Sequence, residues 1–182
     1  MPNKSQISIE YLILTGFILL VIVVPAAIFL SSLANTSVYG TLNTQRAMDL
    51  GNGLVDNAKQ IYYLGLYSKK IVEYTVPQNV KKMFILDLTK DGKDYYYIGI
   101  IIDNGKEVSK NYFPSTIPLM SNITPSNNIG PSYNVPECST AHCTFYNFEG
   151  PVIHEGKKRF KIETGYDSET YEVKASIIPL IG

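Results

Sequence analysis

The feature that most constrains this sequence is an uncharged apolar run near its N-terminus. Residues 11–30 read YLILTGFILLVIVVPAAIFL and include no Asp, Glu, Lys or Arg. As a helix this run would span about 30 Å, the thickness of the hydrocarbon core of a bilayer. A buried helix of a soluble domain normally keeps a polar stripe, which is missing here. Pro25 interrupts the run, and membrane helices tolerate such a proline better than soluble ones. We therefore expect a transmembrane helix.

A cleaved secretory signal peptide is the main alternative. Its apolar region would be only about 7–15 residues long and would follow a strongly basic start. Here the only basic side chain before the run is Lys4, and the next charge after the run is Arg46. The positive-inside rule then places the N-terminus in the cytoplasm. We expect a single-pass protein of the cell membrane or of an extracellular surface filament, with its C-terminal domain outside the cell.

A short motif stands immediately before the apolar run. Gln6, Ser8, Glu10 and Leu14 fit the pattern Q-x-S-x-E-x-x-x-L. This pattern resembles the class III signal peptide of archaeal type IV pilin-like proteins. The resemblance implies that a prepilin-type membrane peptidase cuts between Ser5 and Gln6, and that the apolar helix then packs among other subunits of a filament. The chain departs from the family in having Ser5 where Gly is more usual, and in its short leader.

Glu10 has a physical interpretation that stands beside the resemblance. A carboxylate next to a membrane-spanning run costs free energy wherever the helix draws it below the lipid headgroups. In a filament the carboxylate would be buried, and the new amine on Gln6 of an adjacent subunit could pair with it. A plain signal anchor, with Glu10 resting at the level of the headgroups, is the alternative.

The rest of the chain predicts a helical extension and then a β-domain. Leu50, Leu54, Ala58 and Ile61 recur at helical spacing. The nearby glycines of Gly51-Asn52-Gly53 each weaken a helix by about 1 kcal/mol, which leaves one helix or two open over 31–66. We divide the chain into a leader (1–5), a transmembrane pilin-like helix (6–34), an amphipathic helical extension (35–69) and an extracytoplasmic β-domain (70–182).

Strand signals begin at Lys70. Runs rich in β-branched and aromatic residues lie at 71–76, 83–88, 95–102, 108–113, 144–154, 159–164 and 170–178. Asp91-Gly92 and Asn104-Gly105 are hairpin turn signals, so the runs on either side of them form an antiparallel meander. Residues 114–136 are rich in Pro, Ser and Asn and are expected to form a long loop. The fold class is α+β: a long hydrophobic helix followed by a small antiparallel β-sandwich or rolled sheet.

Two cysteines and two sequons bear on location. Cys138 and Cys143 are expected to form a disulfide, the default state outside the cell. A metal site using both thiolates and His142 is the alternative, but no fourth ligand stands close by. Asn35 and Asn122 begin N-x-S/T triplets and are candidate glycosylation sites on this topology.

Nothing in the sequence indicates catalysis. The formal net charge is zero, which argues against nucleic acid as a partner. The chain has no Gly-rich phosphate loop, nucleophile elbow or paired-His helix, so we expect no catalytic residue, metal or cofactor. Four aspartates near the hairpin turns are interpreted as turn residues rather than a weak Ca²⁺ site, namely Asp87, Asp91, Asp94 and Asp103.

The expected function is that of a pilin-like structural subunit, major or minor, of an archaeal type IV pilus-like surface filament, with an adhesive role left open. Its partners would be copies of itself or other pilin-like subunits, the prepilin-type peptidase and the membrane. One alternative is a monomeric anchored β-domain that binds a surface ligand. The other is an accessory component of the archaellum, which shares the same plan of helix and β-sandwich.

Overall fold

The computed structural model describes residues 4–104, 107–127, 135, 138, 142–167 and 170–180, and leaves the side chains of 4–8 and 32–41 undescribed. The chain divides into two units, residues 1–42 and residues 43–182. The first unit is helical throughout its described part. The second holds the end of the same helix and all the strands described below, and it is called the β-domain from here on.

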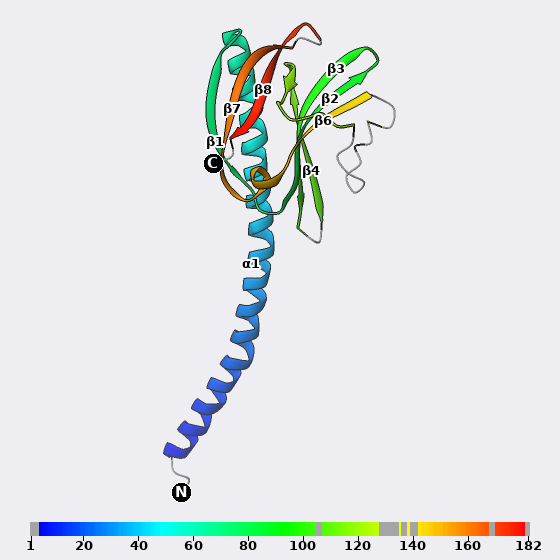
Figure 1. Cartoon of the computed structure of the whole chain (residues 1–182). Coiled ribbons are helices and arrows are strands. Elements are labelled where there is room, and N and C mark those ends of the chain that lie inside the picture. Colours follow the sequence, from blue (N-terminus) through cyan, green and yellow to red (C-terminus); the bar gives the residue numbers. More distant parts are fainter. Residues whose placement is uncertain are drawn as a thin grey trace. The chain divides into compact units, whose positions relative to one another are not determined.

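One helix, α1 (Lys4–Leu64), runs through the apolar segment and the extension (Figure 1). The question of one helix or two is therefore answered, because neither Pro25 nor the Gly51 and Gly53 pair ends it. The helix ends where Gly65 adopts a positive φ of 97° and donates its N–H to the carbonyl of Tyr62 at 3.1 Å. Such a left-handed glycine is the commonest way for a helix to terminate.

The strands form two four-stranded sheets. The mixed sheet has the order β1-β7-β8-β5 and is built from β1 (Lys69–Val76), β5 (Leu119–Met120), β7 (Gly156–Asp167) and β8 (Glu172–Leu180). The antiparallel sheet has the order β4-β3-β2-β6 and is built from β2 (Val80–Lys90), β3 (Lys93–Asp103), β4 (Val108–Ser115) and β6 (His142–Phe148). The expected α+β class is confirmed.

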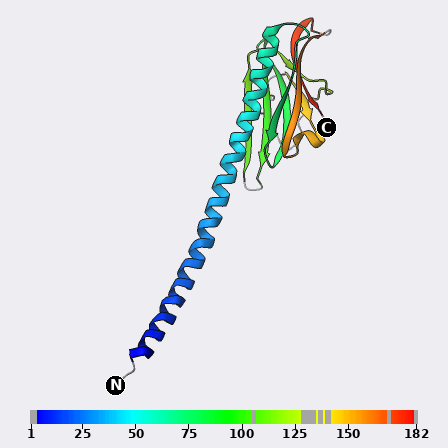
Figure 2. The same cartoon turned by 90° about the vertical axis from the view of Figure 1, so that its left-hand side faces the viewer.

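The apolar core lies between α1 and the inner faces of both sheets (Figures 1 and 2). The helical stripe of Leu50, Leu54, Ala58 and Ile61 is at most 3% exposed, as its spacing predicted. The two sheets also meet directly, since the rings of Phe148 on β6 and Phe160 on β7 pack edge to face with centroids 6.5 Å apart. Burying this stripe against the sheets stabilises the C-terminal part of α1 despite its two glycines.

The glycines of the helix have a packing role that helix propensity does not express. A Cβ atom added at Gly51 would overlap the ring of Phe113 on β4, and one added at Gly53 would overlap the ring and hydroxyl of Tyr74 on β1. Tyr74 is held there by Asn57, whose side-chain amide donates to the tyrosine hydroxyl at 2.7 Å. The glycines therefore allow strands from both sheets to approach the helix closely.

Three differences between the predicted and the observed strands affect the architecture. β5, which lies inside the expected loop at 114–136, runs parallel to β8, so one sheet is mixed rather than antiparallel. The predicted strand at 144–154 ends at Phe148, because Gly150 has a φ of 67° and Pro151 lacks an N–H for a ladder; a 3₁₀ turn, η2 (Gly150–Ile153), follows. β7 is longer than the predicted 159–164, and its partner β1 secures it along Lys69–Val76.

Candidate functional site

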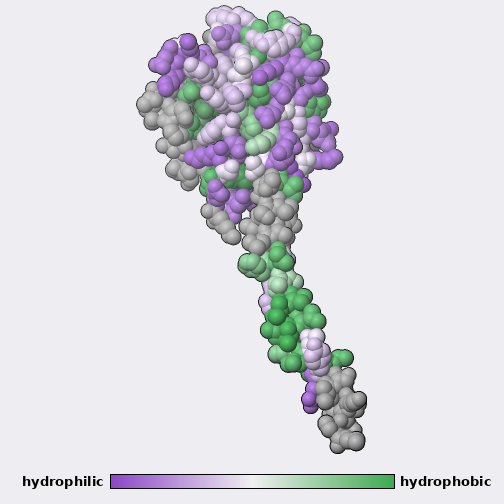
Figure 3. Space-filling model, turned by 180° about the vertical axis from the view of Figure 1, so that it is seen from behind, coloured by the Kyte–Doolittle hydropathy of each residue, from purple (hydrophilic) through white to green (hydrophobic). Residues whose placement is uncertain are grey.

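The described apolar segment of the first unit has no side that is buried within the chain. The segment Ile9–Ser31 of α1 has a mean hydropathy of 2.9, and none of it is buried within the chain. Its large apolar side chains are between 49% and 73% exposed (Figure 3). At 1.5 Å per residue, a helix of this length is about 34 Å long and could cross the hydrocarbon core of a bilayer.

The hydroxyls of Thr15 and Ser31 in this segment are satisfied within the helix. The hydroxyl of Thr15 donates to the carbonyl of Tyr11 at 2.7 Å, and that of Ser31 donates to the carbonyl of Ile28 at 2.8 Å. Such back-bonding removes the cost of taking a hydroxyl out of water. The segment is therefore suited to an apolar surrounding, either lipid or the apolar helices of other chains.

The motif residues lie on the first turns of α1. Ser5, Gln6 and Ser8 belong to the helix, but their side chains lie outside the described residues. Positions 6, 10 and 14 are spaced by four, so Gln6, Glu10 and Leu14 occupy one face of the helix. Glu10 is exposed within the chain and forms no salt bridge among the residues that the structure describes.

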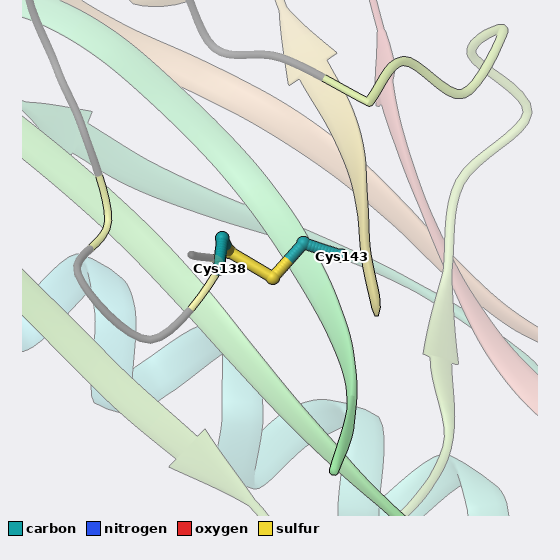
Figure 4. Close-up of a disulfide and its surroundings, with 2 residues drawn as sticks. All are labelled: Cys138 and Cys143. Atoms are coloured by element: carbon teal, nitrogen blue, oxygen red, sulfur yellow. A yellow bond between two sulfur atoms is a disulfide. The ribbon is translucent and has the colours of Figure 1, made fainter. Parts of the chain in front are cut away.

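The predicted disulfide is present. Cys138 and Cys143 are bonded, with their Cα atoms 5.6 Å apart (Figure 4). Cys143 lies on β6 opposite Leu88 of β2 and is 7% exposed, so the bridge ties the chain before β6 onto the outer face of the antiparallel sheet. Disulfides persist in oxidising surroundings, which indicates an extracellular location for the β-domain.

A second apolar cluster lies beside the disulfide and was missed from the sequence. It covers the outer face of the antiparallel sheet and contains Phe84, Leu86, Leu88, Ile101, Val135, Cys143 and Phe145. A cavity of about 130 Å³ opens within it, lined by Leu86, Leu88, Tyr97, Tyr112 and Val135. The signal was present in β2, where 83–86 is a continuous apolar run rather than an alternating one. Such a run marks a strand that is buried on both faces.

A buried ion pair is a further feature that the sequence did not indicate. Lys174 on β8 is only 5% exposed, and its Nζ lies 3.0 Å from Oδ2 of Asp167 on β7. Asp87 on β2 and Tyr96 on β3 belong to the same charged neighbourhood. Burial raises the pKa of the Asp87 carboxyl above its usual value, and the positive charge of Lys174 only partly opposes that rise. Burial and the nearby Asp87 likewise raise the pKa of the Tyr96 hydroxyl.

The raised pKa of Asp87 makes the stability of the β-domain depend on pH. Below the unfolded-state pKa of 3.8, Asp87 is protonated in both states and its charge costs nothing. As the pH rises through the higher folded-state pKa, the folded state must hold a partly buried charge. The free energy of unfolding of the β-domain therefore falls over this pH range. We predict that the Asp87→Asn variant melts a few degrees higher than the wild type at pH 7, and at the same temperature as the wild type near pH 3. Circular dichroism of the full chain in detergent measures both melting temperatures. Asp91→Asn in the exposed β2–β3 turn is the control, and an equal rise in that variant would contradict this account.

The aspartates and the sequons are placed as follows. Asp94 on β3 accepts a hydrogen bond from the Thr89 hydroxyl at 2.7 Å. Asp91 has a φ of 54° in the β2–β3 turn. Both are ordinary features of a turn. In the described part of the chain, no group of three or more His, Cys, Asp and Glu side chains could hold a metal ion. Asn122 is exposed just after β5, whereas the side chain of Asn35 lies outside the described residues.

Comparison with known proteins assigns no family to this chain. No protein-family model, curated protein or solved structure matches this chain. The architecture consists of a long N-terminal apolar helix followed by β-sheets and a disulfide. This is a pilin-like architecture.

Proposed function

We propose that this chain is a structural subunit of an archaeal type IV pilus-like surface filament. The observation that carries the proposal is a helix that is apolar on every side, preceded by the motif Gln6-x-Ser8-x-Glu10-x-x-x-Leu14. A helix without a polar face is stable in lipid or among other apolar helices. Before assembly the segment Ile9–Ser31 would anchor the subunit in the membrane. On assembly the same segment would move into the core of the filament.

The apolar segment of α1 and the β-domain would have separate roles in such a subunit. The segment Ile9–Ser31 would supply the contacts between subunits, while the β-domain has an apolar core of its own. The disulfide suits a domain that faces the outside of the cell, where no reducing system protects thiols. The helix stripe Leu50–Ile61 belongs to the β-domain core and is therefore not available for subunit contacts.

Processing is the first test of this function. We predict that the native mature chain begins at Gln6, because the motif places the peptidase cut between Ser5 and Gln6. Mass spectrometry of the N-terminal peptide from membranes should show the loss of residues 1–5, and Gln6→Pro should block that loss. A mature protein that keeps Lys4, or one cut after Ala34, would remove the filament proposal and leave a signal anchor or a secreted domain.

A monomeric anchored binding domain is the second candidate, and the geometry gives it a specific basis. An anchor needs only the apolar run, and a β-domain with exposed aromatic side chains can bind a ligand without assembling. Glu10 separates the two candidates, since an anchored monomer gains nothing from a carboxylate at the edge of the bilayer. The presence or absence of the native protein in filaments sheared from the cell surface decides between them.

A further inference from the structure

One of the two glycosylation triplets lies in a surface segment that is fixed to the β-domain on both sides. The triplet Asn122-Ile123-Thr124 begins two residues after the end of β5. Before it, the Ser121 hydroxyl donates to the carbonyl of Ile177 on β8 at 2.8 Å. After it, Ser126 exchanges backbone hydrogen bonds with Phe145 on β6, at 2.8 and 2.7 Å. The triplet is therefore held between the mixed sheet and the antiparallel sheet.

The middle residue of this triplet determines which side chains are accessible. Ile123 is half-buried and packs against the main apolar core, whereas Asn122 and Thr124 on either side of it are exposed. The three residues belong to no helix or strand. Pro125 follows them and favours an extended backbone at Thr124. No hydrogen bond joins the Asn122 side chain to another residue that the structure describes, so its amide is accessible from solvent.

An accessible Asn in such a triplet can accept a glycan. In N-glycosylation the amide nitrogen of Asn forms a bond to C1 of a sugar. The bond between C1 and the phosphate of a lipid-linked oligosaccharide donor breaks, and the amide releases a proton. The acceptor also requires Ser or Thr at the third position of the triplet, so both side chains have to reach the transferase. A triplet on a surface loop meets this requirement.

The other triplet, Asn35-Thr36-Ser37, has a different structural setting. It lies inside α1, which is one continuous helix, so its backbone is hydrogen-bonded along the helix. Asn35 also follows the end of the apolar segment at Ser31 by only four residues, or about 6 Å along the helix axis. This triplet would have to unwind close to the bilayer before its Asn and its hydroxyl could enter a transferase.

We propose that Asn122, and not Asn35, carries an N-linked glycan. The inference rests on the proposed location of the β-domain outside the cell, because N-glycosylation modifies surface loops of secreted protein segments. The glycan would extend from the segment after β5 into solvent and add a bulky hydrated group to the surface of the β-domain.

The test is mass spectrometry of the full chain isolated from its native membranes. We expect the wild-type peptide that contains Asn122 to exceed its sequence mass by that of one oligosaccharide. The Asn122→Gln variant should lose the whole added mass. Thr124→Ala should lose it as well, although Asn122 is still present. Thr124→Ser should keep it, because serine also completes the triplet.

Two controls separate loss of the glycan from other effects. Asn35→Gln makes the same substitution in the other triplet and should leave the added mass unchanged. Thiol labelling of each unreduced variant shows whether the Cys138–Cys143 disulfide has formed. A variant without the glycan but with a closed disulfide has a β-domain that reached an oxidising surrounding.

Each contrary result overturns the proposal in a different way. An unmodified Asn122 peptide from a wild type with a closed disulfide refutes the glycan and leaves the location of the β-domain intact. Retention of the added mass in Asn122→Gln places the modification on another residue, and a glycan on the peptide that contains Asn35 refutes the choice between the triplets. Free thiols in the wild type would refute the external location, and the glycan with it. The processing test at Gln6 decides the filament proposal separately.

Discussion

Glu10→Gln is expected to abolish incorporation into filaments while leaving membrane insertion and folding of the β-domain unchanged. In a filament the segment Ile9–Ser31 is buried among neighbouring helices, where Glu10 must be paired, and the mature N-terminal amine of an adjacent subunit is the partner that we propose. Gln keeps the size of the side chain and its hydrogen bonding but removes the charge. Breaking a buried pair from one side costs about 3–5 kcal/mol, or about two to four orders of magnitude in the assembly equilibrium.

The measurement compares the amount of protein in sheared surface material with the amount in membranes, for the wild type and for Glu10→Gln. The protein is detected with an antibody against the β-domain. Glu107→Gln is the matched control, because it makes the same change at an exposed position of the β-domain. If the wild type never enters the sheared fraction, the filament proposal yields to the anchored binding domain. Equal incorporation of Glu10→Gln and wild type would leave the filament in place and refute our account of the carboxylate.

Gly51→Ala is expected to destabilise the β-domain, the opposite of what helix propensity predicts. Replacing a mid-helix glycine with alanine normally stabilises a helix by about 1 kcal/mol. Here the new methyl group would overlap the Phe113 ring, which packs against Gly51 from β4. Overpacking of this kind costs about 1–3 kcal/mol, so we expect the free energy of unfolding to fall. Thermal or denaturant unfolding of the full chain in detergent measures the change.

Two further variants test the reason for this loss. Gly165→Ala on β7 adds the same methyl group where no atom lies within 4 Å, so stability should be unchanged or slightly higher. In the double variant Gly51→Ala/Phe113→Leu, the smaller side chain makes room, and the two substitutions should be less costly together than the sum of their separate effects. Strict additivity would show that the helix and β4 do not meet as described.

The features that could be predicted from sequence rest on local patterns. The apolar helix follows from an uncharged run, because hydropathy and length alone decide whether a segment can span a bilayer. The buried helix stripe follows from the spacing of Leu50, Leu54, Ala58 and Ile61. The β2–β3 hairpin follows from Asp91-Gly92, since a left-handed turn needs such residues. The disulfide follows from two nearby cysteines in a domain expected to be outside the cell.

The tertiary structure alone decided which strands share a sheet and what lies at their surfaces. β1 pairs with β7, about eighty to ninety-four residues later, and no local pattern encodes that choice, because strand pairing depends on how distant apolar faces meet. For the same reason Gly51 looked like a weak point in a helix until Phe113 was seen to pack against it. Lys174 and Asp167 look like ordinary surface charges until β7 and β8 bury them together. Thr164 on β7 is hydrogen-bonded to the turn after α1, a contact between segments about a hundred residues apart that only the folded chain creates.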